Sequence, residues 1–155
     1  MKTAIQFDSP ELFQQAVEDL IKIEMDPQEL SGIEREYFAA TGNEEAYRKN
    51  VEKELKTISG AEKSRMAMDI YEAFPQSRPM LEYARDMFDE VYPDHLDIDN
   101  LVIGLSLGIG LEDEAYMDEV VKKMKDKEGI SPKDKTQAMS LHMKAKRYLA
   151  MKTKQ

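Results

Sequence analysis

Two stretches of sequence, "EEAYRKNVEKEL" at residues 44–55 and "DEAYMDEVVKKM" at residues 113–124, share a pattern that decides the expected fold. Each contains Glu-Ala-Tyr, followed by a valine four residues after the tyrosine and a lysine two residues further on. The second stretch begins 69 residues after the first. The two stretches therefore indicate one structural unit that recurs along the chain.

Helix signals run through the chain, whereas strand signals are nearly absent. Proline and glycine residues separate segments of about 12–17 residues, and no alternating run of β-branched residues or hairpin turn is present. The sequence predicts helices near residues 9–25, 28–41, 43–57, 61–74, 78–91, 97–109, 111–127 and 132–152. Because the turns between them are short, we expect neighbouring helices to pack as antiparallel hairpins.

A period of half the observed distance, about 34 residues, also fits the sequence. A step of this length from Ala46 reaches Met80 and then Ala115, each in a predicted helix. Three helix–turn–helix units are therefore predicted near residues 27–60, 61–93 and 94–128. The aromatic residues expected to be buried between paired helices are Tyr37, Tyr71 and Phe74.

The stretch "IEREYFAATGNEEAYRKNVEKEL" at residues 33–55 resembles a tetratricopeptide repeat, a two-helix unit of 34 residues. Tyr37 precedes the turn, and the small residue Ala46 opens the second helix. "SLGIGLEDEAYMDEVVKKM" at residues 106–124 resembles the motif again, with Ala115 as the small residue. In this family the aromatic residue fills the space between paired helices and the small residue lets them approach.

The resemblance covers residues 27–128 and departs from the family at two points. The chain has no tryptophan for the family's tryptophan position, and Met80 stands where a small residue is expected. The resemblance implies an all-α fold in which antiparallel helical hairpins stack as a short tetratricopeptide-like solenoid. We expect a single domain, residues 1–155, with the helices at 9–25 and 132–152 capping its two ends.

The net charge of −9 is unevenly distributed. Residues 129–155 hold seven basic residues and one acidic residue, which leaves 15 basic against 30 acidic residues, a net charge of −15, in residues 1–128. Such a surface repels nucleic-acid backbones. Nucleic-acid binding is therefore expected only through the basic C-terminal tail, which could equally be the ordinary basic end of a helix.

No arrangement of residues predicts a metal site. The chain lacks cysteine, and His95 and His142 are far apart. "PDHLDID" at residues 93–99 clusters carboxylates around His95, but it lacks the glycine and the glutamate of a calcium loop. We expect this segment to be the capped start of a helix.

No arrangement predicts catalysis or a cofactor either. Gly104, Gly108 and Gly110 follow no strand and do not form a phosphate-binding loop, so we expect them to allow close packing of helices. We predict no catalytic residues, no metal, no cofactor and no enzymatic activity. The absence of cysteine, of a signal peptide and of an apolar span favours a cytoplasmic location.

The leading hypothesis is a protein–protein interaction module, an adaptor or chaperone-like protein that binds a peptide or helical segment of a partner in a concave helical groove. In size and layout the chain also resembles the small secretion chaperones of bacteria. The family resemblance implies that the groove is lined by Arg35, Phe38, Arg65, Asp69, Glu72, Asn100 and Leu107. The identity of the partner and the oligomeric state stay open.

Two alternatives rest on charge. The acidic body could act as a phage-type inhibitor or decoy that imitates nucleic acid, because clustered carboxylates resemble phosphates. The basic tail could instead make the chain a small nucleic-acid adaptor. The C-terminal helix is also rich in methionine, and we expect it to cap the last repeat.

Overall fold

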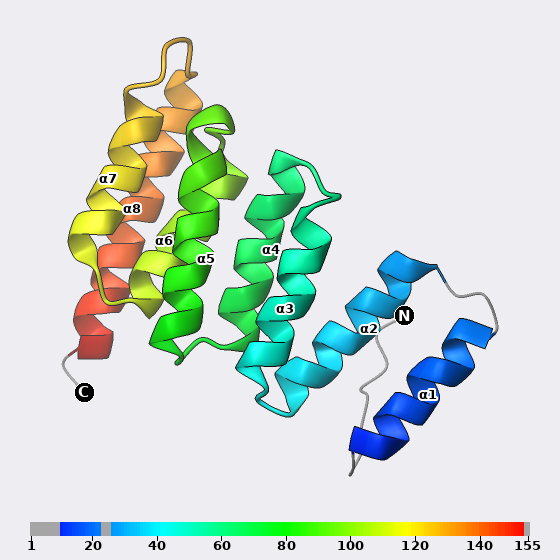
Figure 1. Ribbon diagram of the computed structural model, residues 1–155. Coiled ribbons are helices and arrows are strands. Elements are labelled where there is room, and N and C mark those ends of the chain that lie inside the picture. The colour runs from blue at the N-terminus through cyan, green and yellow to red at the C-terminus, as the bar shows by residue number, and fades with distance from the viewer. Residues whose placement is uncertain (1–9, 23–25, 154–155) are drawn as a thin grey trace. The chain divides into compact units, whose positions relative to one another are not determined.

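The computed structural model describes residues 10–22 and 26–153, which are almost entirely helical (Figure 1). The described helices are α1 (Pro10–Lys22), α2 (Pro27–Ala40), α3 (Glu44–Leu55), α4 (Gly60–Ala73), α5 (Arg78–Val91), α6 (Ile98–Gly110), α7 (Glu114–Lys125) and α8 (Pro132–Thr153), with a short 3-10 turn at Tyr92–Asp94. The all-α prediction is confirmed, and each predicted helix has its counterpart. The predicted end of the first helix, residues 23–25, lies outside the described residues.

Side-chain caps fix where most of these helices begin. The capping residues, whose side chains accept a hydrogen bond from a backbone N–H of the first turn, are Asp26, Asn43, Ser59, Ser77, Asp97 and Asp113. The largest departure from prediction is at α7, which begins at Glu114 rather than at residue 111. Glu112 adopts a positive φ of 53°, so it cannot continue or start a helix, and Asp113 caps α7 immediately afterwards.

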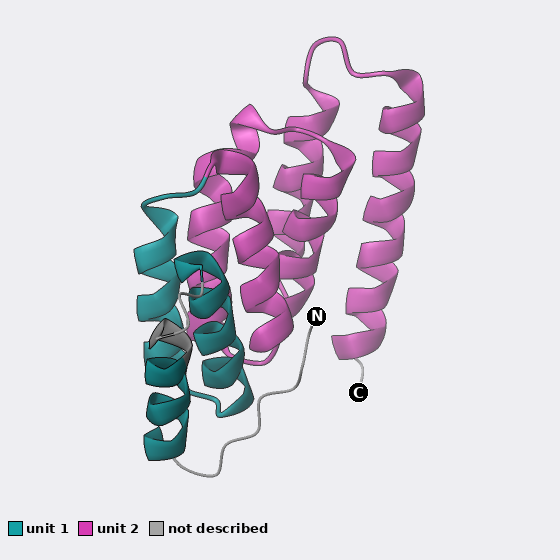
Figure 2. Cartoon of the chain, turned by 90° about the vertical axis from the view of Figure 1, so that its right-hand side faces the viewer, with its two compact units in different colours: residues 1–58 teal, residues 59–155 magenta. Residues whose placement is uncertain are grey.

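The chain divides into two compact units, residues 1–58 and residues 59–155 (Figure 2). In unit 1, α2 and α3 pack against each other as the hairpin predicted for residues 27–60. α1 adds to α2 through aromatic contacts, because the ring of Phe13 stacks on Tyr37 with centroids 3.8 Å apart. Val17 completes this small core.

Unit 2 contains the other two predicted hairpins. α4 packs against α5, and α6 packs against α7, as predicted for residues 61–93 and 94–128. α6 also contacts α4, α5 and α8, and α8 packs on both α6 and α7. α6 is therefore the central helix of this unit. The stacking of hairpins into a tetratricopeptide-like solenoid stays a prediction.

Two glycines of α6 allow its neighbours to come close. A Cβ added at Gly104 would lie 2.7 Å from Val120 Cγ1, and one added at Gly108 would lie 2.3 Å from Met117 Cγ. Both distances are shorter than carbon atoms tolerate, so a larger residue would push α7 away. The expectation that these glycines serve close helix packing is confirmed.

The expected burial of the aromatic residues holds for two of three. Tyr37 and Phe74 are buried, with 7% and 8% of their surface exposed, whereas Tyr71 is only half-buried. Unit 2 buries a different aromatic pair more completely, since Phe88 and Tyr92 stack with centroids 4.8 Å apart. Among the described helices, none has a stretch apolar and long enough to cross a lipid bilayer.

Candidate protein-binding cleft

An open cleft of about 570 Å³ runs between α2 and α3 of unit 1. Its apolar lining includes Leu30 and Phe38 of α2, and its charged lining includes Glu34 of α2 with Lys49 and Lys53 of α3. Leu30, Glu34 and Phe38 are spaced by four residues, which places them in one row along α2. Lys49 and Lys53 form the corresponding row on α3. The cleft is therefore bordered by two parallel rows of side chains.

Phe38 supplies a fixed apolar surface in this cleft. Its ring meets Phe13 of α1 and Tyr37 edge-on, with centroids 6.0 Å and 5.9 Å away. Leu30 likewise packs against this aromatic cluster while remaining only partly buried. Because neighbours hold the Phe38 ring in place, a partner that contacts it loses little additional side-chain entropy. The predicted role of Phe38 in binding is compatible with this position.

A polar network joins the two helices along the cleft. The Oδ1 atom of Asn50 accepts hydrogen bonds from Ser31 Oγ at 3.3 Å and from Arg35 Nη1 at 3.0 Å. Its Nδ2 atom donates to the carbonyl oxygen of Ser31 at 3.1 Å, and Arg35 forms an ion pair with Glu54. Arg35 is largely shielded and already paired, so its main role is to hold α2 to α3. Sequence alone missed this network because its members lie on different helices.

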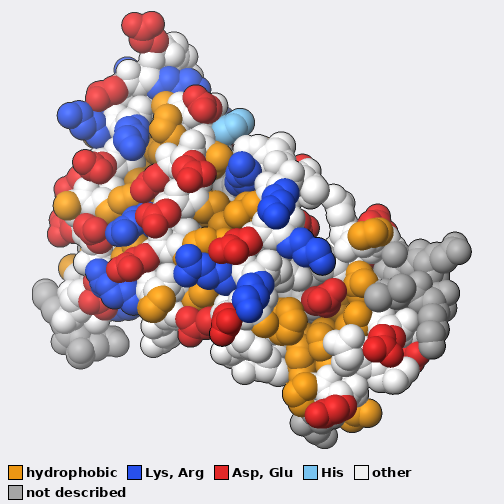
Figure 3. Space-filling view, in the orientation of Figure 1, with side chains coloured by type: hydrophobic (Ala, Val, Ile, Leu, Met, Phe, Trp, Pro, Cys, Tyr) orange, Lys and Arg blue, Asp and Glu red, His pale blue; other side chains and the backbone are white. Residues whose placement is uncertain are grey.

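Charges of both signs surround the apolar part of the cleft. Figure 3 shows hydrophobic side chains gathered over α2, with basic side chains on neighbouring α3. Lys49 pairs with Glu45 of the same helix at 3.1 Å, as expected for exposed residues four apart. Lys53 has no ion pair within the described residues, which leaves its ammonium group available to a partner.

Three of the predicted site residues lie on α4 of unit 2. Arg65 and Glu72 are exposed and Asp69 is half-buried. Their spacing places them on one face of α4. They are thus accessible, but they belong to a different unit from Arg35 and Phe38.

The remaining two predicted site residues require correction. Leu107 is completely buried. Asn100 is only 8% exposed, and its Nδ2 atom already donates a hydrogen bond to the His95 carbonyl oxygen at 2.9 Å. α6 is packed against four other helices, so only a narrow strip of it, including Asp99 and Val102, is exposed. The prediction was wrong because it placed a buried face of α6 on the surface.

The carboxylate cluster near His95 is the start of a helix. Asp97 caps α6 by accepting a hydrogen bond from the backbone N–H of Asn100 at 2.8 Å. The His95 ring lies against Gly60, where an added Cβ would be 2.7 Å from Nε2. In the part of the chain that the structure describes, no three His, Cys, Asp or Glu residues are grouped as metal ligands.

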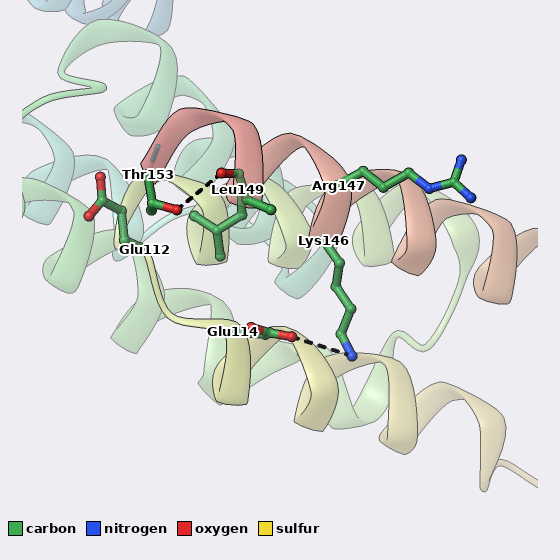
Figure 4. A pocket seen from close by; sticks show the side chains of 7 residues that line it. Glu112, Glu114, Lys146, Arg147, Leu149 and Thr153 are labelled. Carbon is green, nitrogen blue, oxygen red and sulfur yellow. Dashed lines mark hydrogen bonds and ion pairs between the residues drawn. The ribbon is translucent and has the colours of Figure 1, made fainter. Parts of the chain in front are cut away.

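A second hollow, of about 530 Å³, lies between the start of α7 and the end of α8 (Figure 4). Its charges largely satisfy one another. Lys146 of α8 pairs with Glu114 at 3.5 Å and with Asp118 at 3.2 Å, and Lys152 lies 3.9 Å from Glu112. The hydrogen bond to Asp118 raises the pKa of Lys146. These pairs attach α8 to α7 rather than leaving charges free for a ligand.

Burial raises the pKa of both members of a contact between α5 and α7. The Tyr116 hydroxyl donates to Asp89 Oδ1 at 2.8 Å. Burial is the main reason why the pKa of Tyr116 is raised, and the neighbouring Asp89 carboxylate raises it further. Burial also raises the pKa of Asp89, although the Tyr116 hydrogen bond acts against this. The Tyr116–Asp89 hydrogen bond thus holds α5 and α7 together.

No protein-family model matches the sequence, and neither a curated protein nor a solved structure matches it. The functional interpretation therefore rests on the geometry of the described residues.

Proposed function

We propose that this chain is a non-enzymatic protein–protein interaction module, an adaptor or chaperone-like protein. Its α2–α3 cleft binds a peptide or helical segment of another protein. The observation that carries the proposal is the open cleft itself, in which the partly exposed Leu30 and Phe38 lie on either side of Glu34 along α2 and share the cleft with Lys53 of α3. A concave apolar surface with a few charged groups at its edge is the usual form of a recognition site.

The shape of the cleft favours a helical segment. The groove between two antiparallel helices accepts a third helix, whose apolar residues repeat every three or four positions. Such residues would contact Leu30 and Phe38 of α2. Because Glu34 and Lys53 lie on opposite helices, their charges would select one orientation of the bound segment.

We also propose that the three hairpins are tetratricopeptide-like repeats. The α2–α3, α4–α5 and α6–α7 pairings support it, since each repeat of that family is one helical hairpin. α2 and α4 are then the first helices of their hairpins, the position that contacts ligands in such proteins. Arg65, Asp69 and Glu72 of α4 become further partner contacts on this view.

Site-specific cross-linking tests the proposal. A photoreactive benzophenone amino acid replaces Glu34 in one variant and Glu36 in a second. Glu34 lines the cleft, whereas Glu36 is exposed on another face of the same helix. In cells of the native host, we expect a protein adduct from position 34 and none of the same mass from position 36. Equal adducts from both positions would show that α2 contacts proteins without using the cleft.

A charge-reversal pair then measures the contribution of the cleft to affinity for the cross-linked protein. Lys53→Glu changes a residue of the cleft, and Lys56→Glu makes the same change at an exposed residue outside it. We expect Lys53→Glu to weaken binding by about ten-fold and Lys56→Glu to change it little.

The acidic decoy is the second candidate, supported by the net charge of −15 over residues 1–128, from 15 basic and 30 acidic residues. Decoy binding depends on many charge contacts and collapses with added salt, whereas binding around Phe38 persists. The salt dependence of the affinity therefore separates the two. A nucleic-acid adaptor predicts instead that reversing the charges of Lys152 and Lys154 abolishes binding.

A further inference from the structure

α8 carries four of the six exposed large hydrophobic side chains of the described residues, and three of the four are methionines. Met139, Met143 and Met151 are 52%, 54% and 68% exposed. They are spaced by four and eight residues, so they share one face of the helix. Ala138, Ala145 and Leu149, which are buried, lie on the opposite face toward α6 and α7. The expected capping role of α8 does not by itself account for this exposed row.

The same face carries cations that the chain does not use. Lys144 and Arg147 lie beside the methionines, and neither forms an ion pair within residues 10–22 and 26–153. By contrast, Lys146 and Lys152 on the sides of α8 reach carboxylates of the α7 region. The methionines and the two free cations together form the α8 outer face, defined as Met139, Met143, Lys144, Arg147 and Met151.

A hollow of about 410 Å³ lies on this face, lined by Met139, Met143, Lys144 and Arg147 together with two small hydroxyl residues. Methionine side chains are flexible and polarizable, which suits surfaces that adapt to a partner. Cations placed around an apolar hollow favour a ligand that offers an apolar side chain flanked by carboxylates.

We infer that the α8 outer face is a second docking surface, and that it binds an acidic amphipathic helix of another protein. Charge complementarity decides this choice of occupant. The row of methionines contacts the apolar stripe of the incoming helix, and Lys144 and Arg147 pair with carboxylates one turn apart on it. A second copy of α8 fits poorly, because two such faces would bring their cations together. This surface is separate from the α2–α3 cleft and does not depend on it.

Two synthetic helical peptides test the inference with the full chain. Both carry the same leucine stripe, flanked by glutamates in one peptide and by lysines in the other. Fluorescence anisotropy of the labelled peptides gives both affinities. We expect the glutamate peptide to bind at least about ten-fold more tightly than the lysine peptide. Replacing Met139 and Met143 by serine should weaken its binding by a similar factor.

The decisive variant is the double substitution Lys144→Glu and Arg147→Glu, which should invert the preference so that the lysine peptide binds more tightly. The control is Lys122→Glu with Lys125→Glu, which changes the net charge equally at exposed positions of α7. It should leave the preference unchanged. An inversion with both double variants would show a response to net charge alone and would overturn the inference.

Two other outcomes also overturn it. If neither peptide is preferred but the chain sediments with phosphatidylserine vesicles, the face binds anionic lipid. If the chain self-associates and the Met139→Ser, Met143→Ser variant becomes monomeric, a second copy occupies the face.

Discussion

Replacing Gly104 by alanine should destabilise unit 2, because no space exists for the added methyl group. Its carbon would lie 2.7 Å from Val120 Cγ1 and 2.9 Å from the Phe88 ring. Both neighbours are buried, with 3% and 0% of their surface exposed, and neither can move aside without displacing a helix. Overpacking of this kind costs about 1–3 kcal/mol. The higher helix propensity of alanine offsets about 1 kcal/mol of it. The expected net loss is therefore between about 0 and 2 kcal/mol.

Gly32→Ala is the matched control, because it makes the same change in a helix where no atom lies within 4 Å of the added carbon. Without a steric cost it should stabilise its helix by about 0.5–1 kcal/mol. Urea unfolding followed by far-ultraviolet circular dichroism gives the free energy of unfolding of both variants and of the wild type. The dependence of that free energy on urea concentration is compared among the three proteins, to test whether a single transition describes each of them. A Gly104→Ala variant stabilised as much as Gly32→Ala would show no steric cost and would refute the close approach of α7 and α5 to α6.

Three further predictions follow from particular contacts. Tyr92→Phe removes the hydrogen bond from the buried Tyr92 hydroxyl to the Val120 carbonyl oxygen, 2.8 Å long, and should lower the free energy of unfolding by about 1–2 kcal/mol in urea titrations. Desolvation raises the pKa of Asp118, but hydrogen bonds from His142 and Lys146 outweigh it and leave the pKa below its usual value. Asp118 therefore stabilises the fold at pH values above about 4, its pKa in the unfolded chain. This stabilisation is lost as the pH falls through its lower pKa in the folded chain. Asp118→Asn should therefore be less stable than the wild type at pH 7 and equally stable near pH 2, as thermal melts at the two pH values would show. Finally, EDTA should leave the melting temperature unchanged, and a drop that one divalent ion restores would reveal a metal site.

The helices could be predicted from sequence because their boundaries are local. Asn43, Ser59 and Asp97 each mark the start of a helix with a residue that caps it, and proline or glycine separates most of the segments. Pairing into hairpins followed from the short connections. These features depend on residues within a few positions of each other, which is the range over which sequence patterns are informative.

The candidate site was harder to predict because it depends on which face of each helix is covered. Phe38 was assigned to the groove from the family resemblance, and it lines the α2–α3 cleft. Leu107 was misassigned although residues 98–110, "IDNLVIGLSLGIG", are apolar on nearly all sides, a pattern typical of a helix surrounded by other helices. Arg35 was assigned to the groove lining, but it pairs with Asn50 and Glu54, which become its neighbours only when the α2–α3 hairpin forms. The exposed row of methionines on α8 likewise depends on which face of α8 packs against α6 and α7.

The central claim is that the α2–α3 cleft binds another protein, and a charge reversal on α2 tests it most directly. Glu34→Lys changes the cleft, and Glu36→Lys makes the same change two residues away on an exposed face. The affinity of each variant for the protein cross-linked at position 34 is measured by isothermal titration calorimetry, with unfolding checked in parallel. We predict that Glu34→Lys changes the affinity by about ten-fold while Glu36→Lys leaves it near the wild-type value. Equal affinities for both variants and the wild type would contradict the claim.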